Sequence, residues 1–310
     1  MRRFRLGFLL LSLFIAFSSF AQEQRVDWDK IQVKVQKVSG NVYLLQGLGG
    51  NIGAFVSDEG VALIDCEEVQ LGPRIEAALK TLSDKPVKYV MNTHWHGDHT
   101  GGNAYFGKTA IIIAHDNVRR KMAGSHDPRI TDLTVSLPAI TFFDQLTLRM
   151  TGGEIHAVHF EHGHTDGDAV IFFPQANVVM TGDNFTNFDP PHFPPIDADN
   201  DGSGGPQGSI AVAEYILSHT PDDVKIIPGH GGLAGKADLT KYLAALKDTA
   251  AALQAGIAQG KTLDQLKQEN VLAKWASLDS NVIPTNLYVE RLYHGLVPPN
   301  GGDTKVSGAQ

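Results

Sequence analysis

Three histidines and an aspartate within six residues constrain this chain more than any other feature. They are His94, His96, Asp98 and His99. Imidazole and carboxylate ligands without a thiolate suit Zn²⁺ first, and Fe or Mn second. An apolar stretch at 86–91 predicts a buried strand before them, and the glycine-rich run that follows indicates a turn into a helix. We therefore expect the cluster on a strand-to-helix loop, where it can direct two sets of ligands at two adjacent metal ions.

Three more side chains of metal-binding type stand beside predicted strands further along the chain. His164 comes shortly before an apolar run, whereas Asp183 and His230 each come just after one. Glycines flank the last two, which indicates that each strand ends in a turn at that point. This placement brings the two side chains to one rim of a sheet.

Together these positions resemble the metal signature of the metallo-β-lactamase superfamily, and the resemblance extends over about 31–296. It implies two Zn²⁺ ions, with Fe or Mn less favoured. By this resemblance the ligands of the first ion are His94, His96 and His164. Those of the second are Asp98, His99 and His230, and Asp183 bridges the ions or joins the second site.

Two departures from parts of that superfamily narrow the expected chemistry. The chain has Asp183 where some lactamases have a Cys ligand, and in this it resembles glyoxalase II and the lactonases. It also lacks the His-x-Glu-x-Asp pattern of the flavin-linked di-iron relatives. Both departures favour zinc hydrolysis over redox chemistry.

The pattern of predicted elements indicates the fold class. Strand-like segments fill 31–61, an amphipathic helix is predicted at 67–83, and strands followed by helices recur in the second half. This duplication predicts an α/β protein with an αββα sandwich, in which two mixed β-sheets pack face to face with helices outside. We detect no internal repeat and no linker, so 22–310 is expected to form one metallo-β-lactamase-fold domain with a frayed tail from about 298.

Residues 1–21 are typical of a secretory signal peptide. Three arginines precede an apolar run at 6–17, and Ser19 and Ala21 give a small-x-small end. An uncleaved membrane anchor is the alternative, but the apolar run is short for a membrane span. We expect the mature chain to begin near Gln22 and to be periplasmic or secreted, with no membrane attachment after cleavage.

The net charge argues against one class of partner, and the cysteine content excludes an intramolecular disulfide. The formal net charge is −8, and removing three leader arginines takes it to −11, so nucleic acid is not expected as a partner. Cys66 is the only cysteine, which excludes an intramolecular disulfide. Its position at the end of an apolar strand favours a buried inert thiol over a reactive nucleophile.

The ligands predict a mechanism for a small-molecule substrate. Two metal ions about 3.5–4 Å apart share a water, lower its pKa towards about 7 and so present hydroxide to a carbonyl. Asp98 is the expected catalytic residue, because it would orient this nucleophile as well as bind metal. Asp65 is a candidate acceptor behind the metal ligands, although a turn or helix-capping role is an equal alternative.

Four further residues are candidate substrate contacts. Asn103 follows the His cluster and is considered as an oxyanion contact, with a helix-start role as its alternative. The irregular segment 185–208 is expected to form one wall of the substrate cleft. The candidates in that segment are Phe188, His192 and Phe193.

Three functions remain open from the sequence. The favoured one is a dinuclear zinc hydrolase that acts on a β-lactam or a similar cyclic amide. Because Asp183 stands at the ligand position, a lactonase or a glyoxalase II-like thioesterase is the alternative. A non-catalytic zinc-binding protein is the third, but seven ligands over two ions leave open coordination positions, which favours catalysis. The sequence leaves the oligomeric state open.

Overall fold

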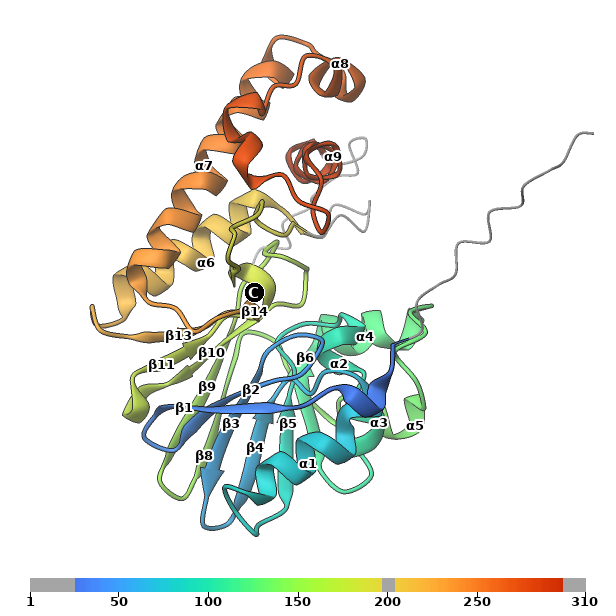
Figure 1. The fold of residues 1–310 in the computed structure, drawn as a ribbon, viewed down its shortest axis with the longest axis vertical. Coiled ribbons are helices and arrows are strands. Elements are labelled where there is room, and N and C mark those ends of the chain that lie inside the picture. Colours follow the sequence, from blue (N-terminus) through green and yellow to red (C-terminus); the bar gives the residue numbers. More distant parts are fainter. Residues whose placement is uncertain (1–25, 197–203, 298–310) are drawn as a thin grey trace, which may run out of the picture.

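The computed structural model describes residues 26–196 and 204–297. Two β-sheets pack face to face in it, with helices on their outer sides (Figure 1). The larger sheet has seven strands in chain order; its neighbours are antiparallel up to β4 and parallel from β4 onward. Its strands are β1 (Lys34–Ser39), β2 (Val42–Gln46), β3 (Ile52–Ser57), β4 (Gly60–Ile64), β5 (Val87–Met91), β6 (Ile111–His115) and β7 (Ile140–Phe142).

The smaller sheet has five strands, and its neighbours are antiparallel except for the parallel pair β11 and β13. In spatial order they are β13 (Lys225–Ile227), β11 (Val178–Met180), β10 (Ala169–Phe173), β9 (Gly153–His159) and β8 (Gln145–Met150). Two short strands, β12 (Thr186–Asn187) and β14 (His230–Gly231), pair in parallel as a separate ribbon.

Alternation along β4 shows why the larger sheet is buried on both sides. Successive side chains of a strand point to opposite faces. Ala62 and Ile64 join the core between the two sheets, whereas Val61 and Leu63 join a core under the outer helices. Across the sandwich, Phe55 of β3 stacks on Phe173 of β10 with ring centroids 6.1 Å apart. The apolar composition of these strands thus fixes a layered arrangement.

Helices cover each sheet from outside. The first half of the chain contributes α1 (Gly72–Lys80), α2 (Gly97–Thr100), α3 (Asn103–Phe106), α4 (Asp116–Gly124) and α5 (Leu133–Ser136). The second half contributes α6 (Pro206–His219), α7 (Lys236–Ala258), α8 (Leu263–Gln268) and α9 (Thr285–Leu296). Residues of α6, α7 and α9 share a core with the smaller sheet, and α7 extends beyond that sheet towards α8 and α9 (Figure 1). The predicted αββα sandwich is confirmed.

Short 3-10 turns complete the chain at η1 (Trp28–Lys30), η2 (Val69–Leu71), η3 (Pro174–Ala176), η4 (Gly182–Asn184) and η5 (Ala273–Leu278). The helix predicted at 67–83 begins later than expected, because η2 precedes α1. Cys66 is fully buried, and burial raises the pKa of its thiol well above the usual range, as an inert thiol requires.

Three expectations about the ends of the chain fall outside the described residues: the leader at 1–21, the start of the mature chain near Gln22, and the tail from about 298. Within 26–196 and 204–297, no helix is both long and apolar enough to cross a bilayer.

Candidate metal centre

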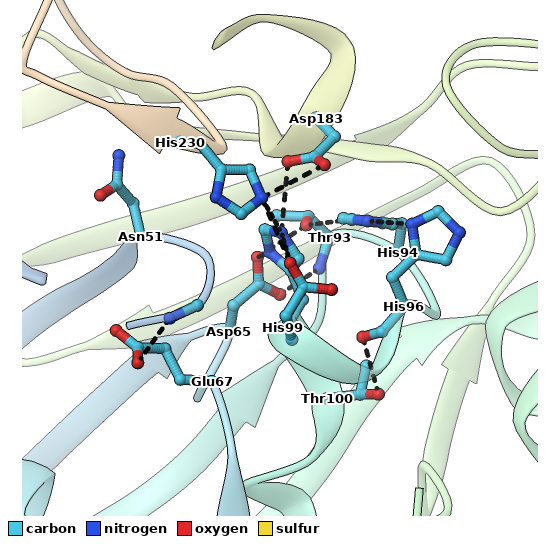
Figure 2. A network of polar contacts seen from close by, with 12 residues as sticks. Asn51, Asp65, Glu67, Thr93, His94, His96, His99, Thr100, Asp183 and His230 are labelled. Atoms are coloured by element: carbon cyan, nitrogen blue, oxygen red, sulfur yellow. Dashed lines mark hydrogen bonds and ion pairs between the residues drawn. The ribbon is translucent and has the colours of Figure 1, made fainter. Parts of the chain in front are cut away.

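The seven predicted ligands meet at one edge of the sandwich, because each follows or precedes a strand that ends there. His94 and His96 lie on the loop after β5, and Asp98 and His99 lie in the first turn of α2. The other three arrive from the smaller sheet and its ribbon: His164 lies between β9 and β10, Asp183 in η4 after β11, and His230 in β14 after β13. Figure 2 shows Asp183 and His230 above His99.

Four of these side chains form a first cluster: His94, His96, His164 and Asp183. His96 Nδ1 lies 3.1 Å from His94 Nε2 and 3.1 Å from His164 Nε2. His164 Nε2 lies 3.7 Å from Asp183 Oδ2. Three imidazole nitrogens and a carboxylate oxygen thus converge on one small volume.

A second cluster adjoins the first and consists of Asp98, His99 and His230. His99 Nε2 lies 3.3 Å from His230 Nε2, and Asp98 Oδ2 lies 3.3 Å from His230 Nε2. Asp183 stands between the clusters, since its Oδ2 is also 3.4 Å from His230 Nε2. One carboxylate therefore faces ligands of both clusters.

The donor atoms fit a pair of divalent ions. Ligand atoms at 2.0–2.1 Å around a tetrahedral zinc ion lie about 3.3 Å from each other, and most of the separations above fall within a few tenths of an ångström of this spacing. Burial and the charge of the nearby His99 hold the pKa of His94 well below its usual range, so its ring is neutral. Burial of Asp183 is outweighed by the charges of His230 and His99, which keep the pKa of this carboxyl well below its usual range. A neutral imidazole and an ionised carboxylate are the forms that bind metal, and His94 and Asp183 are already in them. Burial is outweighed by the carboxylates beside His99 and His230, which raise the pKa of both rings, so each of these two would give up a proton on binding metal.

Asp65 fixes a ligand in each cluster from behind. Its Oδ2 accepts a hydrogen bond at 2.8 Å from Nδ1 of His99 and another at 2.7 Å from the hydroxyl of Thr93. The Thr93 oxygen in turn lies 3.0 Å from Nδ1 of His94. Each histidine therefore turns its Nε2 toward the other ligands, so the structure places Asp65 where an acceptor behind the ligands is expected.

The backbone around Asp65 is strained, which is typical of functional sites. Asp65 and Glu67 have φ of +60° and +51°, a left-handed conformation that side chains rarely adopt. This conformation turns Glu67 toward the loop 47–49, whose three backbone N–H groups donate to its carboxylate. The loop then brings Gly50 against the ring of His99, where a Cβ would lie 2.2 Å from Cε1. Only glycine fits at that position.

A cavity of about 370 Å³ opens over the clusters and includes side chains from distant parts of the chain. Arg129, on the loop between α4 and α5, lines it and donates from Nη1 to Oδ1 of Asp98 at 3.1 Å. Nη2 of the same guanidinium donates to Oδ2 of Asp127 at 2.6 Å. Arg291 of α9 also lines the cavity. The two candidate contacts Phe188 and His192 also line this cavity.

Two of the four candidate substrate contacts lie elsewhere. Asn103 is fully buried, and its amide donates to Asn92 and to the carbonyl of Ser136 at 2.8 and 3.0 Å, so it is not available as an oxyanion contact. Phe193 is also fully buried, because its ring stacks on Tyr288 of α9 at 4.4 Å. Both expectations failed because tertiary packing occupies these side chains.

The sequence reasoning missed Thr93, Glu67, Arg129 and Arg291. Thr93 adjoins the His cluster, and a hydroxyl next to a ligand is a signal that could have been used. No local signal identifies the two arginines, since each reaches the site through the fold.

Comparison with known proteins supports the same family. A family model described as the metallo-beta-lactamase superfamily matches residues 39–247. "Metallo-beta-lactamase type 2" of Bacteroides fragilis is 23% identical over 239 residues, which cover 74% of this chain and 90% of that protein. "Lactamase-like protein vrtG" of Penicillium aethiopicum is 30% identical over 98 residues, covering 32% of this chain and 27% of that protein. The chain therefore spans only about a quarter of the length of that relative.

"Atrochrysone carboxyl ACP thioesterase" of Claviceps purpurea (strain 20.1) is 26% identical over 118 residues, covering 38% of this chain and 33% of that protein. Among solved structures, a metallo-beta-lactamase from Pontibacter korlensis aligns with a TM-score of 0.57 at 19% identity, covering 70% of this chain and 99% of that chain. The DIM-1 metallo-beta-lactamase aligns with a TM-score of 0.58 at 16% identity, covering 71% and 100%. These structural likenesses show the fold. Because the family model matches more than half of the 310 residues, this protein belongs to the metallo-beta-lactamase superfamily, whose members are metal-dependent hydrolases.

Proposed function

We propose that this hydrolase uses two zinc ions to open a β-lactam or a similar cyclic amide. The observation that carries the proposal is the position of Asp183 between two clusters of metal-binding side chains under an open cavity. Two bound zinc ions would supply an activated water and polarise the substrate carbonyl. The ligands would be His94, His96 and His164 at the first ion and Asp98, His99 and His230 at the second, with Asp183 shared.

Asp98 is the proposed catalytic residue, and Arg129 positions it. Arg129 Nη1 donates a hydrogen bond to Asp98 Oδ1, and Oδ2 of the same carboxylate faces His230. Asp127 in turn fixes the guanidinium through Nη2 and Nε. A carboxylate held in this way presents one oxygen to the site in a constant orientation, as general-base and positioning roles require.

The charge of the cavity supports an anionic substrate. Arg129 is already shared among carboxylates, whereas Arg291 makes no ion pair within the described part of the chain. Its neighbour Glu290 faces Lys267 instead, with a contact of 2.6 Å. The exposed Val282, which also lines the cavity, adds an apolar surface. Penicillins and cephalosporins combine a carboxylate with an apolar ring system, which fits this wall.

A lactonase or thioesterase on the same centre is the second candidate. Asp183, rather than a thiolate, as the shared ligand favours it, and one relative is named a thioesterase. A non-catalytic zinc protein fits less well, because a structural site is closed by four protein ligands per ion. Here seven side chains serve two proposed ions below an open cavity.

The test is hydrolysis of a chromogenic cephalosporin by the zinc-loaded mature protein, alongside a panel of lactones, thioesters and phosphodiesters. We expect the lactam to be opened, and the activity to be lost on chelation and in Asp98→Asn. Asp279→Asn, which alters an exposed residue that does not line the cavity, is the matched control. An untouched cephalosporin with a cleaved lactone or thioester would refute the lactamase proposal and leave the hydrolase intact.

We also propose that the protein works in the periplasm or outside the cell. The basic and apolar leader supports export. β-Lactams act in the periplasm, so an exported hydrolase would meet them there.

A further inference from the structure

The loop between β2 and β3, residues 47–51, lies against the helix that carries two of the proposed ligands. The backbone N–H of Gly50 donates to the carbonyl of Asp98 at 3.0 Å. Gly49 packs just as closely, since a Cβ there would lie 2.8 Å from the same carbonyl oxygen. One part of the β2–β3 loop is therefore fixed to α2, the helix of Asp98 and His99.

The end of the same loop is fixed to the turn that carries His230. The backbone N–H of Asn51 donates to the carbonyl of Gly229 at 2.7 Å. Its side-chain amide donates to the carbonyls of Pro228 and Gly231 at 2.8 and 3.0 Å. These carbonyls lie on both sides of His230 along the chain, and Figure 2 shows Asn51 beside the His230 ring. Asn51 thus holds the turn at three points.

The contacts of Asn51 are built into the fold. The side chain is only 3% exposed, and its oxygen accepts from Nε2 of Gln46 at 2.9 Å, so both its amide nitrogen and its oxygen are paired. Gln46, the last residue of β2, also donates to the carbonyl of Gly231 at 2.8 Å. The loop before Asn51 is held by Glu67, whose carboxylate accepts from the backbone N–H groups of 47–49.

The turn of His230 is held from two directions. Two of its N–H groups donate to the segment after β11: Gly229 to the carbonyl of Phe185 and Gly232 to that of Asn187, each at 2.9 Å. Its carbonyls receive the β2–β3 loop instead. The first set of bonds fixes the turn to the smaller sheet, and the second fixes it to the larger sheet.

The second cluster needs both attachments, because its ligands come from both sheets. Asp98 and His99 follow β5 of the larger sheet, whereas His230 follows β13 of the smaller sheet. Side chains of a metal site must be held within about 0.5 Å of the productive geometry. We propose that the β2–β3 loop sets the spacing between these two groups of ligands, with Asn51 as the positioning residue for His230. The inference rests on the proposed dinuclear zinc centre and assigns a role to a residue outside its ligands.

Zinc affinity, measured by competition with a chromogenic chelator, tests this role. Asn51→Ala removes the side-chain bonds and keeps the backbone N–H. It should bind one zinc ion about 10- to 100-fold more weakly, the range for groups that orient metal ligands, with unchanged affinity for the other ion. Gln46→Leu removes the second donor to Gly231 and should weaken the same ion about fivefold, the effect of one hydrogen bond. Asn41→Ala is the matched control at the other end of β2, where the amide donates to Val56 at 3.2 Å, and it should bind both ions normally.

Hydrogen exchange in the metal-free protein tests the same contacts without zinc. The backbone amides at positions 50 and 51 should exchange about tenfold faster in Asn51→Ala than in the wild type or in Asn41→Ala. Faster exchange together with weaker binding of one ion supports the inference. Unchanged exchange, wild-type zinc affinity, or equal weakening of both ions would overturn it. A wild-type protein that binds two ions and hydrolyses nothing in the substrate panel would refute the proposed hydrolase and leave this inference standing.

Discussion

Replacing Asp65 by asparagine should weaken zinc binding far more than it disturbs the fold. Asp65 is fully buried and accepts three hydrogen bonds, from the backbone and hydroxyl of Thr93 and from His99 Nδ1, at 2.7–2.8 Å. Asparagine has one acceptor oxygen, so in either orientation its NH₂ group faces at least one of these donors. A hydrogen bond to a buried charge contributes about 1.5–3 kcal/mol, which corresponds to roughly a 10- to 100-fold loss of affinity. The same range is typical for partners that orient metal-bound histidines.

Competition with a chromogenic chelator measures this effect directly. The dissociation constant of the more weakly held zinc ion should rise by about 10- to 100-fold in Asp65→Asn, while the far-ultraviolet circular dichroism is unchanged. Asp279→Asn serves as the control, since that carboxylate is exposed and accepts from Thr285. Wild-type zinc affinity in Asp65→Asn would show that this carboxylate does not orient the ligands.

Three other predictions concern stability and processing. Burial raises the pKa of Asp168 from 3.8 to about 7 despite hydrogen bonds from Thr165, so the folded protein keeps a proton that the unfolded chain loses above pH 4. The free energy of unfolding should fall by about 2.5 kcal/mol between pH 5 and pH 8 through this group. In urea unfolding, Asp168→Asn should not show this fall. The same pH dependence in Asp168→Asn and in the wild type would contradict the prediction. Ile171→Ala removes a fully buried side chain between the sheets and should cost about 3 kcal/mol in urea unfolding, against less than about 0.5 kcal/mol for the exposed Phe143→Ala. Intact mass of exported protein should match a chain that begins near Gln22, and a retained leader would favour a membrane anchor instead.

The convergence of the seven proposed ligands could be predicted from the sequence because each is tied to a local signal. His94, His96, Asp98 and His99 lie within six residues after β5, and Asp183 and His230 follow apolar runs that end as strands. Since strand ends meet at a sheet edge, local reasoning was enough to bring them together. The two-sheet sandwich followed in the same way from the order of strands and helices.

The surroundings of the ligands depend on packing between distant segments, which a single sequence does not display. Phe193 was expected in the cleft, but a ring 95 positions later, that of Tyr288, covers it. Asn103 was expected near the substrate, but Asn92 and the backbone of α5 take its amide. Arg129 reaches Asp98 only because the loop between α4 and α5 folds over α2. Side chains that act through such contacts have no spacing signature.

The dependence of hydrolysis on zinc tests the central claim most directly. Protein freed of metal by chelation would be titrated with zinc while the opening of a chromogenic cephalosporin is followed. If each of the two clusters that share Asp183 binds one zinc ion, the protein has no activity without zinc, and the rate reaches its plateau at two equivalents of zinc per chain. A plateau at one equivalent, or a rate that does not depend on zinc, would contradict a dinuclear hydrolase.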